Sequence, residues 1–415
     1  MRAAPLLGGL AVVAGLALAP SCVESHSTTH GPASASTGAG AGRAASSGAA
    51  TGFDKHALLA NLGERVVLAT YREFASRVGD LALACSAWKA SGASSERAVA
   101  QGAWKSAMST WQRAELMQLG PAAPMSLPGG KDLRDEIYSW PSVNACAVDQ
   151  ELVKAEYENE EVFANKLVNV RGLAALEHLL FDEDEENACA PQNTINAAGT
   201  WSAIVPELSL RRAAYATTLA GLVASRAAAL RDAWEPSAGD YLAELATPGQ
   251  RYQASAQEAL NAVSDAMFYL DTETKDLKLA VPAGLAAECA TVTCPEKLEL
   301  RESRHGEAAL RENLLAFQLL FHGGASFDEQ ALGFDDWLTA AGAGELSATM
   351  AADLAAALAA IDAIPGSDLE AALATEPKSL ETAYGAVKKI TDQLKTEFVT
   401  VLDLELPDAA ATDND

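Results

Sequence analysis

Two glutamates stand at positions where the sequence spacing predicts buried, apolar side chains. Leu173 lies four residues before Glu177, so Glu177 falls on the apolar face of a predicted helix. In an earlier helix, Trp111 lies four residues before Glu115, which therefore continues a tryptophan-containing face. Ionised side chains are rarely buried unless they are paired, hydrogen-bonded or bound to a metal. Both glutamates are therefore candidates for a functional site.

Iron binding is the chemistry that such carboxylates favour. Inward-facing glutamates in helical bundles hold iron and similar cations, together with imidazole. We therefore predict a metal site made of Glu115, Glu177 and His178. His178 follows Glu177 directly, so on an ideal helix it points about 100° away from it. The alternative is a buried ion pair, in which Arg134 or Arg171 neutralises Glu177 and no metal binds.

Familiar catalytic motifs are missing from the sequence. It contains neither the HExxH helix of zinc peptidases nor the GxSxG turn of serine hydrolases. A GxGxxG fingerprint and a phosphate-binding loop are also missing. We therefore nominate no catalytic residue and expect a protein that binds a ligand without transforming it.

The composition predicts an all-α protein that does not bind nucleic acid. Hydrophobic residues make up 49% of the chain but aromatic residues only 6%, so the core is built largely from alanine and leucine. These two residues are the strongest helix formers. The formal net charge of −26 argues against nucleic-acid binding, because phosphate backbones need a basic surface.

The elements that carry the glutamates belong to a series of predicted helices. Apolar spacing and breaker residues predict helices over residues 95–119, 148–156, 170–181, 201–234, 304–321, 346–361 and 380–402, and a helical segment over 241–270 that is interrupted around Pro248-Gly249. We expect two helical-bundle domains, 53–200 and 201–406. Arg171 and Arg311 each stand eight residues before a Leu-Leu-Phe sequence, which is the pattern of a diverged duplication.

Both ends of the chain lie outside these domains. Residues 1–22 form a predicted signal segment, and residues 23–52 form a flexible tether rich in Ser, Thr, Ala and Gly. The segment from Ala19 to Cys22 is similar to a lipoprotein box, so we expect a lipid anchor on Cys22 that attaches the protein to a membrane. Residue 23 is not the aspartate that favours inner-membrane retention, which points to the outer membrane. A soluble periplasmic protein is the alternative. Residues 407–415 form an acidic tail.

The cysteines fit an exported protein. Cys146 and Cys189 lie on either side of the central predicted helix, and we expect them to bridge. Cys289 and Cys294 are close together in a loop and form the second predicted bridge. Cys85 sits in an apolar stretch, where we expect a free buried thiol.

At several segments the sequence resembles the imelysin family, exported bacterial proteins that are also described as iron-regulated. The matching segments follow the family's order: Trp104 with Trp111 to Glu115 and Gly120-Pro121, then Ile137 to Pro141, Cys146 to Asp149, Arg171 to Phe181, and Asn313-Leu314 with the helix to Phe321. This resemblance implies two all-helical bundles, a location in the cell envelope and contact with the iron-uptake machinery.

The resemblance also identifies a site motif, GxHxxE, in the central helix. Gly172 and Glu177 match its first and last positions, but Ala174 stands in place of the histidine. This departure weakens both a peptidase and a metal site of the family type. We expect a binding pocket beside the motif, and its candidate residues are Arg134, Tyr138, Trp140, Arg171 and Gly172.

Three functions follow from these features. The first is a non-enzymatic, envelope-anchored protein that binds iron, another metal or a small ligand in iron acquisition. The second is a metal-dependent peptidase, as imelysin itself has been classed. The third is a structural or partner-binding lipoprotein whose buried charges only stabilise the fold and which binds no metal.

Overall fold

The computed structural model describes residues 52–324 and 331–411, and within these ranges the secondary structure is helical, with no strand. The predicted all-α class is confirmed. The predictions for residues 1–22, for Cys22 and for nearly all of the tether at 23–52 lie outside the described residues. The same holds for residues 412–415 of the acidic tail.

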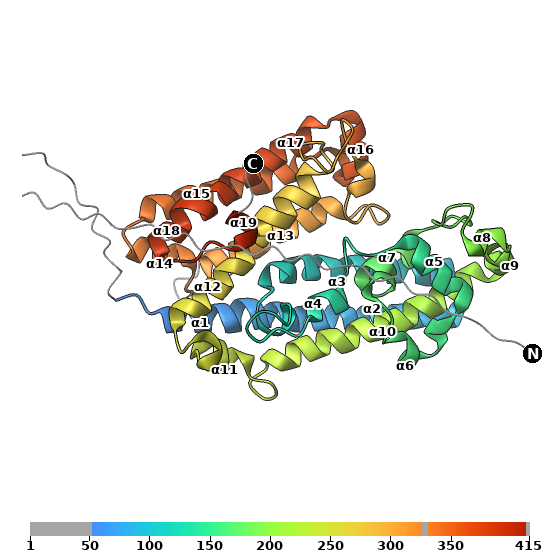
Figure 1. The fold of residues 1–415 in the computed structure, drawn as a ribbon, viewed down its shortest axis with the longest axis horizontal. Helices are drawn as coiled ribbons and strands as arrows, with labels where there is room; N and C mark the ends of the chain where they lie inside the picture. Colours follow the sequence, from blue (N-terminus) through green and yellow to red (C-terminus); the bar gives the residue numbers. More distant parts are fainter. Residues whose placement is uncertain (1–51, 325–330, 412–415) are drawn as a thin grey trace, which may run out of the picture. The chain divides into compact units, whose positions relative to one another are not determined.

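Long helices from the first part of the chain pack side by side (Figure 1). Helix α1 (Lys55–Asn61) continues through a π-helical turn into α2 (Ala69–Ser91), which packs against α3 (Ser94–Ala114) and α10 (Leu208–Trp234). Asp54 caps α1 by accepting a hydrogen bond from the backbone nitrogen of Ala57, as its position before the apolar run predicts.

The central helix α7 (Gly172–Phe181) is buried from Gly172 to Leu180. Its beginning requires glycine. Gly172 has a φ of +80°, and a Cβ atom there would lie 2.7 Å from the carbonyl oxygen of Ile137. On the α3 side, the indole nitrogen of Trp104 donates a hydrogen bond to the carbonyl oxygen of Leu173, at 2.9 Å. The helix is therefore held from two directions.

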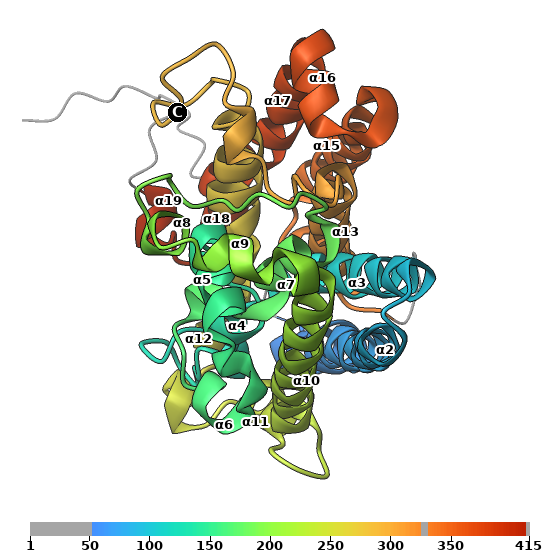
Figure 2. The same ribbon diagram turned by 90° about the vertical axis from the view of Figure 1, so that its right-hand side faces the viewer.

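The later helices pack mainly against one another (Figure 2). Helix α12 (Ala256–Met267) leads into the π-helical segment η8 (Leu270–Ala280), which packs on α17 (Lys378–Gln393). Helix α15 (Gly344–Asp362) packs on both α17 and α13 (Gly306–His322), and α13 also contacts α3. The shorter α-helices are α4 (Leu133–Ile137), α5 (Ala145–Lys154), α6 (Glu160–Phe163), α8 (Thr194–Ala197), α9 (Thr200–Ile204), α11 (Tyr241–Ala246), α14 (Phe334–Ala340), α16 (Leu369–Thr375), α18 (Val399–Leu402) and α19 (Asp408–Ala411).

One predicted helix is divided in the structure. The segment expected as a single helix over 201–234 contains α9 and α10, with Pro206 in the short 3₁₀ turn between them. Although α10 follows the expected domain boundary at residue 200, it packs on α2 and α7. The division into two bundles and the duplication stay predictions.

Both expected cysteine pairs are bonded in the structure. Cys146 is joined to Cys189, with their Cα atoms 4.6 Å apart, and Cys289 is joined to Cys294, with their Cα atoms 5.7 Å apart. Cys85 is a free thiol in the core, and burial raises its pKa to about 12. The first bridge fastens the start of α5 to the chain that follows α7.

Candidate functional site

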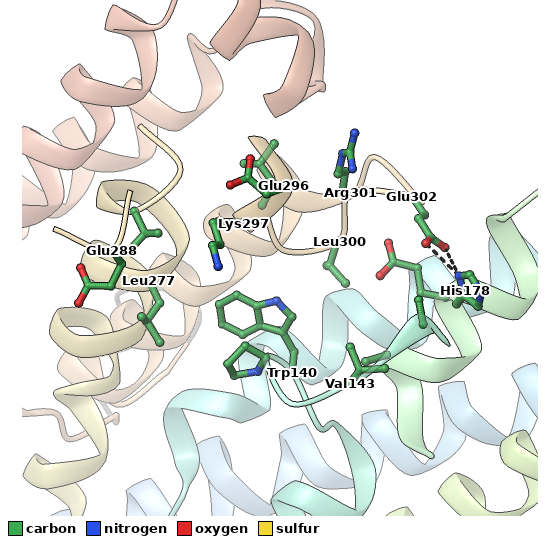
Figure 3. Close-up of a pocket in the computed structure, with 16 residues that line it drawn as sticks. Trp140, Val143, His178, Leu277, Glu288, Glu296, Lys297, Leu300, Arg301 and Glu302 are labelled. Atoms are coloured by element: carbon green, nitrogen blue, oxygen red, sulfur yellow. Dashed lines mark hydrogen bonds and ion pairs between the residues drawn. The ribbon is translucent and has the colours of Figure 1, made fainter. Parts of the chain in front are cut away.

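A cavity of about 500 Å³ opens beside α7 (Figure 3). Helix α7 contributes Ala174, Glu177 and His178 to its wall, and the loop before α5 contributes Trp140 and Val143. The opposite wall comes from η8, which contributes Leu277, and from the later chain, which contributes Glu288, Glu296, Lys297, Leu298, Leu300, Arg301 and Glu302. The cavity has the size of small-molecule sites in proteins, with apolar walls and charged groups of both signs.

Glu177 is the motif carboxylate, and it lies in the wall of this cavity. Its Oε1 atom accepts a hydrogen bond from the backbone nitrogen of Ser303, at 2.9 Å, and its side chain is largely buried. Burial raises the pKa of Glu177 to about 7, although the Ser303 hydrogen bond opposes this effect. Among the described residues, no lysine, arginine or histidine forms an ion pair with Glu177. Its carboxyl group therefore changes charge near neutral pH.

His178 also reaches the cavity, but both of its ring nitrogens are engaged. Nδ1 lies 3.0 Å from Oε1 of Glu302, and Nε2 lies 3.0 Å from Oδ1 of the buried Asp149 (Figure 3 shows the contact with Glu302). Burial alone would lower the pKa of His178, but the hydrogen bonds to the two carboxylates raise it to about 10. A protonated imidazole has no lone pair for a metal, so His178 is an ion-pair partner in this structure.

Glu115 lies in a different, closed network. It is fully buried, its Oε1 is 3.3 Å from Nη2 of Arg134, and its Oε2 is 3.5 Å from Nζ of Lys278. The hydroxyl of Tyr269 donates a hydrogen bond to the same Oε2 atom, at 2.5 Å. Arg134 and Lys278 therefore compensate the charge of Glu115 inside the protein.

The three residues predicted to bind metal are thus not brought together. Glu177 and His178 face one cavity with separate partners, and Glu115 is enclosed by Arg134 and Lys278. Over residues 52–324 and 331–411, no group of three or more His, Cys, Asp and Glu side chains is arranged to hold a metal ion. Helical spacing places each glutamate on a buried face but does not decide which groups it meets there.

The Glu115 network continues through Lys278 to other buried polar groups. Nζ of Lys278 lies 2.6 Å from Oε1 of Gln112, 3.0 Å from Oδ1 of Asn313 and 3.0 Å from Oε2 of Glu299. The hydroxyl of Tyr138 donates to Glu299 at 2.6 Å. Tyr138 therefore belongs to this network, which joins α3, α13 and η8, and it does not line the cavity at Glu177.

The remaining predicted pocket residues take several positions. Trp140 lines the cavity, whereas Arg134 lines a smaller neighbouring cavity of about 160 Å³, which Trp140 also borders. Arg171 makes two hydrogen bonds to Glu136, at 2.8 and 3.0 Å, so it positions the chain before α7. Gly172 permits the close approach of α7 to the chain at Ile137.

The alternative prediction, an ion pair of Arg134 or Arg171 with Glu177, is wrong. Arg134 pairs with Glu115, and Arg171 pairs with Glu136.

The segment 288–302 was not identified from the sequence. It supplies five charged residues to the cavity, Glu288, Glu296, Lys297, Arg301 and Glu302. Its only signal in the sequence is a run of charged residues after the Cys289–Cys294 pair and Pro295. Charge runs are usually solvated surface, so this signal could not separate a pocket wall from an exposed loop.

Comparisons with known proteins agree with the all-helical fold. The sequence profile of the imelysin family matches residues 67–396. The fold is similar to the crystal structure of a Parabacteroides distasonis ATCC 8503 protein with the provisional name iron-regulated protein A precursor, with a TM-score of 0.62 and 16% identity over 84% of this chain and 94% of that chain. It is also similar to an imelysin-like protein from Psychrobacter arcticum 273-4, with a TM-score of 0.64 and 15% identity over 85% of this chain and 96% of that chain. No curated protein matches the sequence.

Proposed function

The chain belongs to the imelysin family, and from this premise we propose that it is an exported, non-enzymatic protein that binds a small ligand for iron acquisition. The observation that carries the proposal is the cavity of about 500 Å³ at the family's motif helix. Ala174 and Glu177, which occupy the motif's histidine and glutamate positions, both line it.

The pocket residues do not fit a bare iron ion. Ala174 offers no donor atom, both nitrogens of His178 contact carboxylates, and Oε1 of Glu177 already accepts a hydrogen bond. Iron prefers several oxygen and nitrogen ligands at once. We therefore propose that iron reaches this pocket within a small organic complex whose own atoms coordinate it, and that the protein contributes the apolar walls and the rim charges.

Export and anchoring are part of the same proposal. The N-terminal sequence supports a signal segment and a lipidated Cys22, and the two disulfides are typical of an exported protein. The name of the similar Parabacteroides distasonis protein contains the words "iron-regulated" and "precursor". We propose an outer-membrane lipoprotein that works with the iron-uptake machinery, with a soluble periplasmic form as the alternative.

Iron retention by the purified full-length protein tests the function. The protein is incubated with ferric citrate, with ferric nitrilotriacetate or with ferrous iron alone, and the retained iron is measured after gel filtration. We expect saturable retention of at least one ferric complex, and weaker retention by Glu177→Gln. Asp362→Asn is the matched control, because Asp362 is an exposed carboxylate that pairs with Arg311.

Two results would contradict the proposal. Equal retention by Glu177→Gln and the parent protein would place the ligand elsewhere, and no retention of any complex would remove the role in iron binding. Cleavage of an unfolded protein substrate that a chelator stops, and that Glu177→Gln abolishes, would favour the metal-dependent peptidase instead.

A further inference from the structure

A second cavity, of about 550 Å³, lies apart from the one at Glu177 and shares none of its lining residues. It is formed by the chain around residues 118–128, by α12 with the beginning of η8, and by the chain at Glu405 and Pro407. Its volume is within the range of pockets that enclose small organic molecules.

Much of the wall of this second cavity is apolar. Leu119, Pro124, Leu127 and Phe268 are among the residues that line it, together with the ring of Tyr269. Leu127 keeps 50% of its surface exposed, and nearby Met125 keeps 74%. Large apolar side chains that stay exposed beside a cavity are typical of a binding surface. A ligand with an apolar body would cover Leu127.

The charges that line the second cavity are mostly negative. Four carboxylates, Glu258, Asp265, Glu273 and Glu405, face a single basic residue among the described lining, Arg251. Arg251 is directed elsewhere: its guanidinium lies 3.9 Å from Glu244 and 5.8 Å from the ring centre of Tyr241.

Two of these carboxylates, Asp265 and Glu405, lie near each other and have no basic partner among the described residues. The backbone nitrogen of Glu405 donates to Oδ1 of Asn261, which lies one helical turn before Asp265 on α12. In the described parts of the chain, no lysine or arginine forms an ion pair with Asp265 or Glu405. Asp265 and Glu405 both keep exposed surface, and partial desolvation together with the charge of Glu405 raises the pKa of Asp265 to about 6, the direction expected for an uncompensated pair.

We propose that the second cavity binds an organic cation with an apolar body, whose charged group lies at Asp265 and Glu405. The apolar wall contributes hydrophobic contact, and the cation compensates the two carboxylates. An inorganic cation fits less well, since in the described structure these carboxylates are not arranged as a group of three or more ligands that could hold a metal ion. An anionic ligand would meet four carboxylates and only Arg251.

Three ligands that share one apolar body and differ in charge test which sign of ligand charge the cavity prefers. Binding of 4-phenylbutylamine, 4-phenylbutan-1-ol and 4-phenylbutanoate to the purified full-length protein is measured by calorimetry at pH 7.5. We expect the amine to bind at least fivefold more tightly than the alcohol, and the carboxylate to bind most weakly. Equal affinities for amine and alcohol, or no saturable binding of the amine, would overturn the proposal.

Variants then locate the site. We expect Asp265→Asn/Glu405→Gln to lose the preference for the amine, and Asp362→Asn to keep it. Should the double variant fail to fold, as judged by circular dichroism, Glu405→Gln alone replaces it, because Glu405 is exposed. A retained preference in the folded variant would overturn the proposal. The same variants should retain ferric complexes normally, so this test is independent of the function proposed above.

Discussion

Glu177 and Ser303 are 126 residues apart in the sequence, yet the carboxylate of Glu177 accepts a hydrogen bond from the backbone nitrogen of Ser303 at 2.9 Å. This bond fastens the central helix to the segment that forms the opposite wall of the cavity. It uses Oε1 of Glu177, which is otherwise buried without a basic partner among the described residues. The motif carboxylate therefore has both a structural contact and a charge that burial makes unfavourable.

The first prediction concerns this unfavourable charge. The pKa of Glu177 rises from its ordinary 4.5 to about 7 in the folded protein, so folding favours its protonated form. Its stabilising contribution is complete below pH 4.5 and is lost as the pH rises through 7. Glu177→Gln has no ionisable group at this position, so the variant does not lose this contribution to stability as the pH rises. Relative to the parent, the variant should gain roughly 3 kcal/mol of unfolding free energy between pH 4.5 and pH 8, at about 1.36 kcal/mol per pKa unit.

Urea denaturation of both proteins at pH 4.5, 6 and 8 measures this difference. Subtracting the parent curve from the variant curve cancels the titration of other carboxylates. A difference that does not change with pH would show that Glu177 is ionised at its ordinary pKa in the folded protein.

The second prediction concerns the closed network at Glu115. Glu115→Ala removes the carboxylate that the buried Lys278 shares with the partly buried Arg134, so it should lower the unfolding free energy by about 3–5 kcal/mol. Asp362→Ala breaks the exposed pair with Arg311 and should cost less than about 1 kcal/mol. Chemical denaturation of the two variants side by side provides the comparison. Similar small losses would mean that the network is open to water.

The third prediction concerns the beginning of the central helix. Gly172→Ala adds a Cβ atom at 2.7 Å from a backbone oxygen, at a residue with φ of +80°. We expect a loss of about 1–3 kcal/mol from strain. Gly221→Ala is the matched control, since Gly221 lies within α10 with no atom within 4 Å of the added Cβ. It should gain about 0.5–1 kcal/mol. Thermal denaturation of both variants checks that the two changes in stability have opposite signs.

The fourth prediction ranks the two disulfides. The Cys146–Cys189 bridge spans 43 residues and the Cys289–Cys294 bridge spans 5. The longer closed loop restricts the unfolded chain more, so its removal by paired serine substitutions should cost about 4 kcal/mol, against about 2 kcal/mol for the shorter one. Guanidinium denaturation under oxidising conditions measures both losses. The reverse order would show that the shorter bridge contributes mainly through the folded state.

The fifth prediction restores the family motif. Ala174 lines the same cavity as Glu177 and precedes it by three residues, so the two side chains share one face of α7. Ala174→His should therefore create a pair of donors and raise the affinity for zinc at least tenfold over the parent, as measured by calorimetry. The double variant Ala174→His/Glu177→Gln should lose this gain. Unchanged zinc affinity in Ala174→His would show that the two side chains do not converge.

Several features could be predicted from the sequence because they depend on local spacing or composition. Alanine and leucine content predicts an all-helical fold, and the spacing around Glu177 and Glu115 places both carboxylates on buried faces. The cysteine positions on either side of the central helix predict the bridge that the structure contains. The order of short motifs was sufficient to identify the family that the profile match confirms.

Only the tertiary structure decided which charges meet. Helical spacing determines the face on which a residue lies, but the neighbouring segment that covers this face depends on how distant elements pack. Arg134 therefore pairs with Glu115 and not with Glu177, and His178 lies between Asp149 and Glu302, which are 29 and 124 residues away. Glu177 is buried at the cavity without a basic partner among the described residues, so its pKa rises and its carboxyl group titrates near neutral pH. The physical reason is the packing of the segment after residue 288, which forms the opposite wall of the cavity.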